Sequence, residues 1–465
     1  MRTRWVLYSS LVIAFLFVGG LGCRGGSKEA VAAAKPVTLE YWSTIHDSRL
    51  MDELITKYRA THQQIRIRYR RLRPEEFEQQ IVEALAEDRG PDIISLHNSW
   101  VGKYQTKLLP APPSVQVAQV YTKKGAIGTE QITQLATTAL FSPQQMERVF
   151  VPAVVNDVVR ADEKGKPQIW GLPVTLDTMV LFYNQDLLDQ AGVPQAPASW
   201  AELQDAVVAA TRYDSAGNIV QAGGAFGAGK NVDRAADIIT ALILQNGATM
   251  SDSRGRAVFN LIAEGQSADT SPAIQALQFY TDFGNPTKQV YTWNAQMESS
   301  LDAFSRGKAT FFFGYSYHIP LLKARAPKLN YRILQMPQLD PNKPKNVANY
   351  WVESVSKKSK APNEAWDFIS FITRAEQSDA YAERMRKPTA LRASIDKQLQ
   401  NPDLAPFAAQ VLSAQSWYRG RNPEAADSAL AEMIDYIHDN RALEESGDLF
   451  GTTVNRAASK INQSL

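Results

Sequence analysis

The chain has 465 residues, of which 44% are hydrophobic and 21% charged, and this length is typical of two or three domains with buried cores. Its 50 Lys and Arg residues against 48 Asp and Glu residues give a formal net charge of +2, which argues against a nucleic acid as the main partner. One cysteine and five histidines exclude an internal disulfide and any multi-cysteine metal site, so we predict no metal and no cofactor.

Residues 1–22 have the features of an export signal. Arg2 and Arg4 precede an apolar run over 5–18, and small residues follow it. The run is shorter than the roughly 20 residues that span a membrane, although an uncleaved anchor is an alternative. The segment closes on Cys23, and the arrangement resembles a bacterial lipoprotein signal in which the cysteine thiol is acylated. We therefore predict a lipidated Cys23 and a flexible linker over 23–36, which would hold the protein on the extracytoplasmic face of the cell membrane.

Alternating strands and helices follow from residue 37. Strand patterns at 37–42, 65–70 and 91–96 are separated by amphipathic helix patterns at 47–58 and 77–86. The arginines of the second strand alternate with Ile65 and Ile67, which favours a solvated edge strand over a nucleic-acid groove. This order indicates a doubly wound α/β lobe with a parallel sheet. Ligands of such sheets lie beyond the carboxyl ends of the strands, which places the loops at 43–46 and 97–100 at a candidate site.

A second α/β pattern begins at residue 170, after a stretch over 114–150 that we interpret as mostly helical. It opens with a strand at 179–184 and a helix at 200–213 that Ser199 caps. Further helices are predicted at 233–246, 272–283 and 298–306, and further strands at 308–314, 331–336 and 349–355. The chain ends in predicted helices at 362–373, 376–386, 403–414 and 424–439.

The motif search finds no catalytic signature. Gly224 to Lys230 has the spacing of a phosphate-binding loop, but Asn231 stands where Ser or Thr is required, so we interpret the segment as a glycine-rich loop. Asp177 and Glu353 lie beside predicted strand ends among aromatic residues. A glycosidase pair is the catalytic interpretation, and carboxylates that hydrogen-bond sugar hydroxyls are the alternative that we favour.

Aromatic side chains recur at strand ends beside Ser, Asn, Asp or His. An aromatic plane matches the apolar face of a pyranose ring, and neighbouring polar groups can bind its hydroxyls, whereas each aromatic residue alone is equally typical of a core. The recurrence favours a carbohydrate site that includes Trp42, Trp100, Tyr183, Trp293, Tyr315, Tyr317, Tyr350 and Trp351.

Ordered sequence blocks across 37–375 resemble one family, the extracellular solute-binding proteins of ABC importers, of the maltose-binding type. The matching blocks are Leu39-Glu-Tyr-Trp42, Pro91-Asp-Ile-Ile94, Gly171-Leu-Pro-Val174 through Ser199-Trp200, Phe304-Ser-Arg-Gly-Lys308 and Val355 through Ile369. The resemblance implies two doubly wound α/β lobes joined by crossing hinge strands, with a ligand cleft between them. It also implies a first lobe over 37–150 plus 298–345 and a second over 151–297 plus 346–465.

The resemblance carries several site residues over to this chain. It implies Ser43, His46, Asn98, Trp100, Asp177, Tyr315, Tyr350, Trp351 and Arg386 as ligand-binding residues, to which side-chain chemistry adds Tyr183, Trp293 and Asn294. The implied function is that of a monomeric, lipid-anchored binding subunit that closes on a carbohydrate and delivers it to a membrane permease, without catalysis. Three alternatives stay open: the same fold binding a polyamine, glycerol phosphate or peptide, a secreted glycan-active enzyme that uses Asp177 or Glu353, and a family member that acts as a sensor or scaffold with a blocked cleft.

Overall fold

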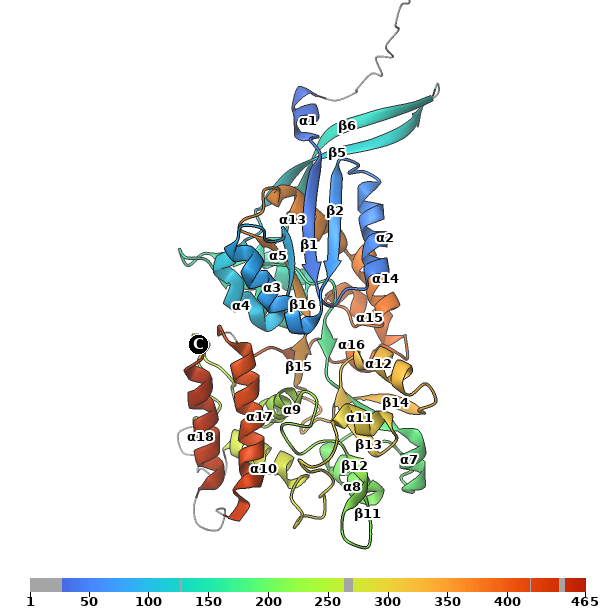
Figure 1. Ribbon diagram of the computed structural model, residues 1–465, viewed down its shortest axis with the longest axis vertical. Helices are drawn as coiled ribbons and strands as arrows, with labels where there is room; N and C mark the ends of the chain where they lie inside the picture. The colour runs from blue at the N-terminus through green and yellow to red at the C-terminus, as the bar shows by residue number, and fades with distance from the viewer. Residues whose placement is uncertain (1–26, 126–127, 263–270, 419, 443–447) are drawn as a thin grey trace, which may run out of the picture.

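The computed structural model describes residues 27–125, 128–262, 271–418, 420–442 and 448–465. They form two α/β lobes, lobe 1 at the top of Figure 1 and lobe 2 at the bottom. Each lobe has its own hydrophobic core, drawn mainly from 39–176 and 348–395 in lobe 1 and from 179–347 and 417–461 in lobe 2. The predicted two-lobed α/β fold is confirmed. Cys23 and the predicted signal lie outside the described residues, and within those residues no helix combines the length and apolar character needed to cross a membrane.

The sheet of lobe 1 contains the three strands predicted first along the chain. Its order is β2 (Ile65–Arg71), β1 (Val37–Ser43), β3 (Ile93–His97), β16 (Trp351–Ser356) and β4 (Leu108–Leu109). β1 pairs in parallel with β2 and β3, whereas β16 runs antiparallel to β3. Ile65 and Ile67 of β2 are buried while Arg66 and Arg68 are exposed, so the predicted solvated face of this edge strand is confirmed.

Helices cover both faces of this sheet. In α2 (Ser48–Arg59) the Asp47 side chain accepts a hydrogen bond from the Leu50 amide, and Leu50, Leu54 and Tyr58 are buried at helical spacing. The other helical and strand segments of lobe 1 are α3 (Pro74–Ala86), α4 (Val101–Tyr104), α5 (Pro143–Val149), α6 (Pro152–Val158), β7 (Val159–Ala161), β8 (Pro167–Ile169), α13 (Pro362–Ile372), α14 (Ala375–Met385) and α15 (Ile395–Leu399).

The stretch predicted as helical over 114–150 begins instead with a β-hairpin, so this prediction is wrong. β5 (Ser114–Gly125) pairs antiparallel with β6 (Gly128–Ala139) along their whole lengths, and the hairpin extends beyond the top of lobe 1 (Figure 1). Its Val, Ile and Thr content favours extended backbone over helix. Val115 and Val117 enter the core of lobe 1 at alternate positions, a period of two that the many polar residues obscure.

The linker predicted over 23–36 contains a helix, α1 (Lys28–Ala33), so the prediction of a flexible segment is wrong for these residues. The Ser27 side chain accepts a hydrogen bond from the Ala30 amide, and Ala30 is 1% exposed. The helix contacts β5 and β6, and alanine is the residue that favours helix most. The N-terminal segment therefore lies beside the hairpin rather than free of the fold.

The sheet of lobe 2 has the order β11 (Arg212–Tyr213), β12 (Ile219–Gly224), β13 (Ala309–Gly314), β10 (Val180–Asn184) and β14 (Tyr331–Gln335). β10 and β13 are buried along their whole lengths, as expected for central strands that helices cover on both faces. The surrounding helices are α7 (Gln185–Gln190), α8 (Trp200–Ala210), α9 (Ala235–Gln245), α10 (Pro272–Asp282), α11 (Ser300–Ser305), α12 (His318–Arg325), α16 (Ala405–Ala408), α17 (Pro423–Asp439) and α18 (Leu449–Asn462). Ser199 caps α8 as predicted.

The chain passes between the lobes three times, and the crossings overturn the predicted lobe boundaries. A small sheet of β17 (Ala414–Gln415), β15 (Asn346–Asn349) and β9 (Asp177–Thr178) joins the lobes. β13, predicted in lobe 1, lies between β12 and β10 of lobe 2, and β16, predicted in lobe 2, lies between β3 and β4 of lobe 1. Residues 151–176, predicted in lobe 2, belong to the core of lobe 1. β13 is buried on both faces and largely apolar, so its pattern does not say which sheet receives it.

Candidate ligand-binding cleft

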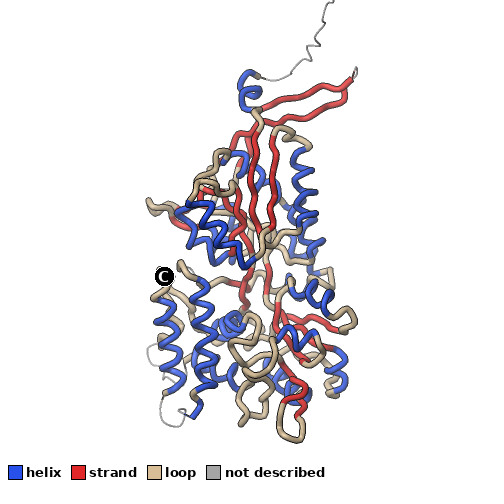
Figure 2. The backbone as a smooth tube through the Cα atoms, in the orientation of Figure 1, coloured by secondary structure: helices blue, strands red, loops and turns tan. Residues whose placement is uncertain are grey.

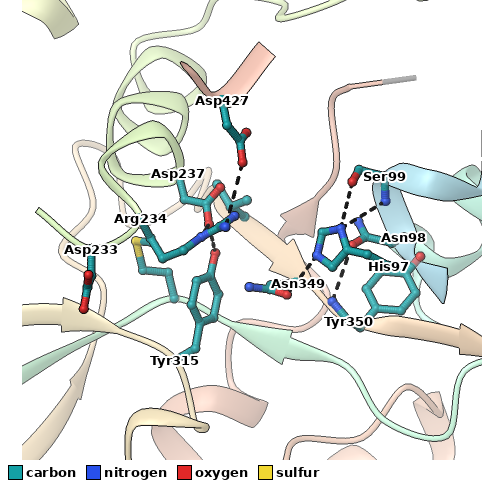
Figure 3. Close-up of polar contacts among 12 residues, drawn as sticks. His97, Asn98, Ser99, Asp233, Arg234, Asp237, Tyr315, Asn349, Tyr350 and Asp427 are labelled. Carbon is teal, nitrogen blue, oxygen red and sulfur yellow. Dashed lines mark hydrogen bonds and ion pairs between the residues drawn. The ribbon is translucent and has the colours of Figure 1, made fainter. Parts of the chain in front are cut away.

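Polar side chains of both lobes face one another where the hinge strands cross. The parallel strands of lobe 1 run toward this junction in Figure 2, and β15 lies within it. The carboxyl end of β3, the start of α9 and the end of β13 all contribute residues here. Figure 3 draws Arg234, Asp237, Tyr315 and Asp427 of lobe 2 opposite His97, Asn98 and Ser99 of lobe 1, with Asn349 of β15 between them.

Arg234 organises the lobe 2 side of the cleft. It precedes α9 with a left-handed backbone, φ 59°, a conformation that costs a non-glycine residue about 1–3 kcal/mol and that gathers at functional sites. Its Nε lies 2.7 Å from Asp237 Oδ2, and Tyr315 donates its hydroxyl to the same oxygen at 2.7 Å. Arg234 is 30% exposed and Asp237 8%, so the guanidinium stays open to the cleft while the carboxylate is held behind it.

Asp427 of α17 is the second carboxylate beside this guanidinium, at 3.8 Å. Burial raises the pKa of Asp427 to about 6, although the charge of Arg234 opposes the rise. Asp427 comes from a helix that follows α9 in the chain by almost 180 residues. The lobe 2 side of the cleft is therefore assembled from three distant segments.

His97 at the end of β3 is the central polar group on the lobe 1 side. Its Nδ1 accepts from the Ser99 amide at 3.4 Å, which leaves Nε2–H to donate to Asn349 Oδ1 at 3.1 Å. Burial, with a smaller contribution from the charge of Arg234, lowers the pKa of His97 to about 4. The imidazole is consequently neutral at pH 7, and the influence of Arg234 reflects the approach of the two lobes.

Two tryptophans continue the lobe 1 side beyond His97. The Trp351 ring lies 5.7 Å from the His97 ring and 6.2 Å from the Trp100 ring. Phe77 stacks behind Trp100 with 6.4 Å between ring centroids. Both tryptophans are partly exposed, so they present a supported aromatic surface next to polar groups.

Asp177 lies at the hinge and is enclosed by it. It is 4% exposed and accepts hydrogen bonds from the Ser316 amide at 3.1 Å, the Ser316 hydroxyl at 2.5 Å and the Thr178 amide at 3.0 Å. Burial raises the pKa of Asp177 to about 6, while the charge of Lys387 and these hydrogen bonds act in the opposite direction. Beyond Ser316, Tyr317 stacks on Tyr315 with ring centroids 5.8 Å apart and is 37% exposed.

Six of the twelve predicted ligand residues lie at this junction. They are Asn98, Trp100, Asp177, Tyr315, Tyr350 and Trp351. Tyr315 and Tyr350 are buried beneath the cleft surface. Tyr315 is 0% exposed, and Tyr350 is 3% exposed and donates its hydroxyl to Asp157 Oδ2 at 2.6 Å. Asn98 donates to Ser416 Oγ at 2.7 Å, which links β3 to the segment that follows β17.

The other six lie away from the junction. Tyr183, Trp293 and Asn294 belong to the body of lobe 2, where Trp293 is 0% exposed and donates to Asn231 Oδ1 at 3.1 Å. Arg386 lines a separate cavity of about 490 Å³ with Tyr331 and Asp403. Ser43 and His46 follow β1 as predicted, but both side chains are buried inside lobe 1.

The His46 side chain points into lobe 1 because it forms a hydrogen bond with the buried Glu353 carboxylate. Glu353 is 0% exposed and accepts from His46 Nε2 at 2.7 Å, Tyr41 at 2.6 Å and Ser95 at 2.5 Å. On its other side, His46 Nδ1 lies 2.8 Å from the Tyr381 hydroxyl. Glu353, the second carboxylate considered for catalysis, is thus satisfied inside the core of lobe 1 and does not face the cleft.

The strand-end rule places His97 in the predicted loop at 97–100, although His97 is not among the predicted ligand residues. Four further residues of the cleft were not predicted: Arg234, Asp237, Asn349 and Asp427. Asp233 to Asp237 places three charges at a predicted helix start, which is a usable signal. No local pattern marks Asp427, because its role depends on where α17 lies.

The glycine-rich loop over 224–230 has a structural partner in α17. The amides of Gly229 and Lys230 donate to the Asp435 carboxylate at 2.7 and 3.1 Å. These donors are the groups that a phosphate would need, and a side chain of the same chain holds them. Among the described residues, no three His, Cys, Asp or Glu side chains are grouped to hold a metal ion.

Two cores, three crossings and a polar cleft between the lobes define a two-lobed binding protein. The family model of the bacterial extracellular solute-binding proteins matches residues 53–406, and the chain belongs to this family. Binding proteins of Brucella abortus (strain 2308) and Brucella suis biovar 1 (strain 1330) are 24% identical over 253 residues, 53% of this chain. The match spans 57% of the length of these relatives.

Solved structures share the fold at low sequence identity. A cyclo/maltodextrin-binding protein complexed with maltotetraose is 14% identical with a TM-score of 0.68, covering 92% of this chain and 97% of its own. A cyclic α-maltosyl-1,6-maltose binding protein from Arthrobacter globiformis is 16% identical, with a TM-score of 0.67 and coverage of 92% and 99%. An ABC transporter solute-binding protein from Thermotoga lettingae, bound with α-D-tagatose, is 17% identical with a TM-score of 0.64 and the same coverage. The family and these neighbours are binding proteins.

Proposed function

We propose that the protein binds a carbohydrate between its lobes and acts as the substrate-binding subunit of an ABC importer. The observation that carries the proposal is that the Arg234 guanidinium, 30% exposed and fixed by Asp237, faces the partly exposed rings of Trp100 and Trp351 across the cleft. Fixed charged groups bind hydroxyls, and aromatic faces bind the apolar side of a sugar ring. Two of the similar solved structures hold α-D-tagatose and maltotetraose, which agrees with this ligand class.

Capture works through closure of the lobes. A ligand that contacts Arg234 of lobe 2 and His97 of lobe 1 binds the closed form better than the open one, and so shifts the population toward closure. The hinge strands β9, β15 and β17 form the small sheet that joins the lobes and absorb the change. The membrane permease then distinguishes the loaded protein from the empty one by shape.

The proposed setting is the extracytoplasmic face of the cell membrane. The signal-like segment before Cys23 supports export and lipid attachment at that cysteine. The protein works as a monomer that presents its solute to the permease and catalyses no reaction. The enclosure of Asp177 and Glu353, the two carboxylates considered for glycoside hydrolysis, supports binding without catalysis.

A second ligand class has one observation in its favour. Asp237 and Asp427 both lie beside a single guanidinium, that of Arg234. An excess of carboxylates favours a cationic ligand, so an amine-bearing solute is the second candidate.

Thermal shift with a solute panel tests the proposal. A bound ligand at 100 times its Kd stabilises the folded state by about 2.7 kcal/mol, so a monosaccharide or oligosaccharide of the panel should raise the melting temperature. A rise with polyamines alone would select the second candidate. No rise with any saccharide would contradict the proposed function.

Two arginine variants localise the site. Arg234→Met should abolish the shift, because the open guanidinium is lost. Arg256→Met is the matched control: Arg256 forms a similar pair with Asp252 in lobe 2, at 2.8 Å, and this variant should keep the full shift. Equal shifts in both variants would place the ligand elsewhere.

A further inference from the structure

An ion pair joins the two lobes. Lys103 of α4 in lobe 1 lies 3.5 Å from Glu424 in the first turn of α17 in lobe 2. The Lys103 side chain is 23% exposed and that of Glu424 51%. Since α4 and α17 belong to different lobes, this contact exists only while the lobes are close together.

Lys103 is held in place on the lobe 1 side by three further groups. Its ammonium contacts the Glu78 carboxylate of α3 and lies 5.5 Å above the centroid of the Trp100 ring and 5.9 Å from that of Tyr104. Tyr104 in turn donates its hydroxyl to Glu78 at 2.8 Å. A lysine fixed by a carboxylate and two rings loses little freedom when it reaches a second carboxylate.

We propose that Lys103 is a positioning residue for ligand capture, which holds the lobes together through Glu424 before ligand binds. The rotation that opens the cleft breaks the Lys103–Glu424 pair but leaves the Lys103–Glu78 pair within lobe 1. The pair therefore favours the closed form and raises the fraction of molecules that are ready to bind. The apparent affinity for ligand scales with that fraction. This role of Lys103 in capture rests on the proposed function, whereas the ion pair itself holds the lobes together whichever ligand binds.

The same geometry gives Lys103 a second effect on the site. Its ammonium covers one face of the Trp100 ring, so a ligand that stacks on this face has to displace it. Trp351 lies beside Trp100 and carries no such cover among the described ring contacts. Within the aromatic surface, Trp351 is then the ring available while the lobes are held together.

The test measures opening of the ligand-free full chain by small-angle X-ray scattering, together with hydrogen exchange of residues 98–104 and 422–427. Glu424→Lys and Lys103→Glu should each increase the radius of gyration and speed exchange, because like charges then meet across the cleft. An exposed pair of this kind changes the open-to-closed ratio by about two- to fivefold. The double variant Lys103→Glu/Glu424→Lys should recover part of the closed population.

The matched control is Lys397→Met, which removes a similar exposed pair, Lys397–Glu383 at 3.6 Å, within lobe 1. It should leave both measurements unchanged. Salt at 1 M, where the Debye length is about 3 Å, should open the wild type as Glu424→Lys does. An unchanged radius and exchange in both single charge reversals, or no recovery in the double variant, would overturn the proposal. No solute is used, so this result is independent of whether the protein binds carbohydrate.

Discussion

Substitution of Glu353 probes the buried network that turns His46 away from the cleft. The carboxylate is 0% exposed and accepts hydrogen bonds from His46, Tyr41 and Ser95. Glu353→Ala leaves three buried donors without an acceptor and opens a cavity. Removing one partner of a buried charged network costs about 3–5 kcal/mol, which corresponds to a fall in melting temperature of roughly 6–20 °C for a domain of this size.

Glu353→Gln should lower the free energy of unfolding by only about 1–2 kcal/mol. The amide oxygen can keep the hydrogen bonds from Tyr41 and Ser95, and the amide NH2 then faces His46 Nε2. His46 can accept there by moving its proton to Nδ1, from which it donates to the Tyr381 hydroxyl. The network therefore predicts a large difference between the alanine and glutamine variants.

Chemical denaturation, monitored by circular dichroism, gives the free energy of unfolding of both variants. The value is taken from the transition in which lobe 1 unfolds. Glu40→Ala is the matched control, because Glu40 on β1 is 39% exposed and pairs with Arg68 at the surface; its effect should stay within about 1 kcal/mol. The reasoning is refuted if Glu353→Ala falls within 1 kcal/mol of wild type, or if glutamine destabilises as much as alanine.

Three further substitutions test single groups. The pKa of His97 is about 4 in the folded protein, below its ordinary value, so the contribution of His97 to stability falls as pH falls from 6.5 toward 4, and the melting temperature of His97→Gln should rise relative to that of wild type over this interval; a constant difference between the two melting temperatures would contradict this. The pKa of Asp177 is raised to about 6, so the contribution of Asp177 falls as pH rises from 4 to 6, and the melting temperature of Asp177→Asn should rise relative to that of wild type over this interval; no such relative rise would count against it. Asp435→Ala leaves the Gly229 and Lys230 amides unpaired and should lower the unfolding free energy by about 1–3 kcal/mol; an unchanged denaturation midpoint would show that water replaces the carboxylate.

Local periodicity was sufficient for most elements of the fold. The alternation of Ile65 and Ile67 with arginines predicts β2, and the spacing of Leu50, Leu54 and Tyr58 predicts α2. The hairpin of β5 and β6 was missed because Thr and Gln occupy many of its positions. Lobe membership could not be read from β13, because its Phe311 to Phe313 run is apolar on both faces and fits the centre of either sheet.

The cleft was predictable only where it depends on strand ends. That rule places Asn98 and Trp100 correctly because η1 (Asn98–Trp100) continues directly from β3. The same rule fails for His46, whose side chain is held by a carboxylate 307 residues later in the chain. Arg234 and Asp427 come together only through the approach of α17 to α9, which no local pattern encodes.

The position of β16 has a consequence for how the chain folds. The strands of lobe 2 all lie within 212–335 apart from β10, which immediately precedes them, whereas the sheet of lobe 1 stays incomplete until residues 351–356 are available. Lobe 2 can therefore form its sheet from a nearly continuous segment. In lobe 1, β3 and β4 stay unpaired on one edge until β16 inserts between them. Contacts between residues far apart in the chain form slowly, and open strand edges invite association with other chains. Closure of the first sheet by β16 is thus the step at which refolding is expected to be slowest and most sensitive to protein concentration.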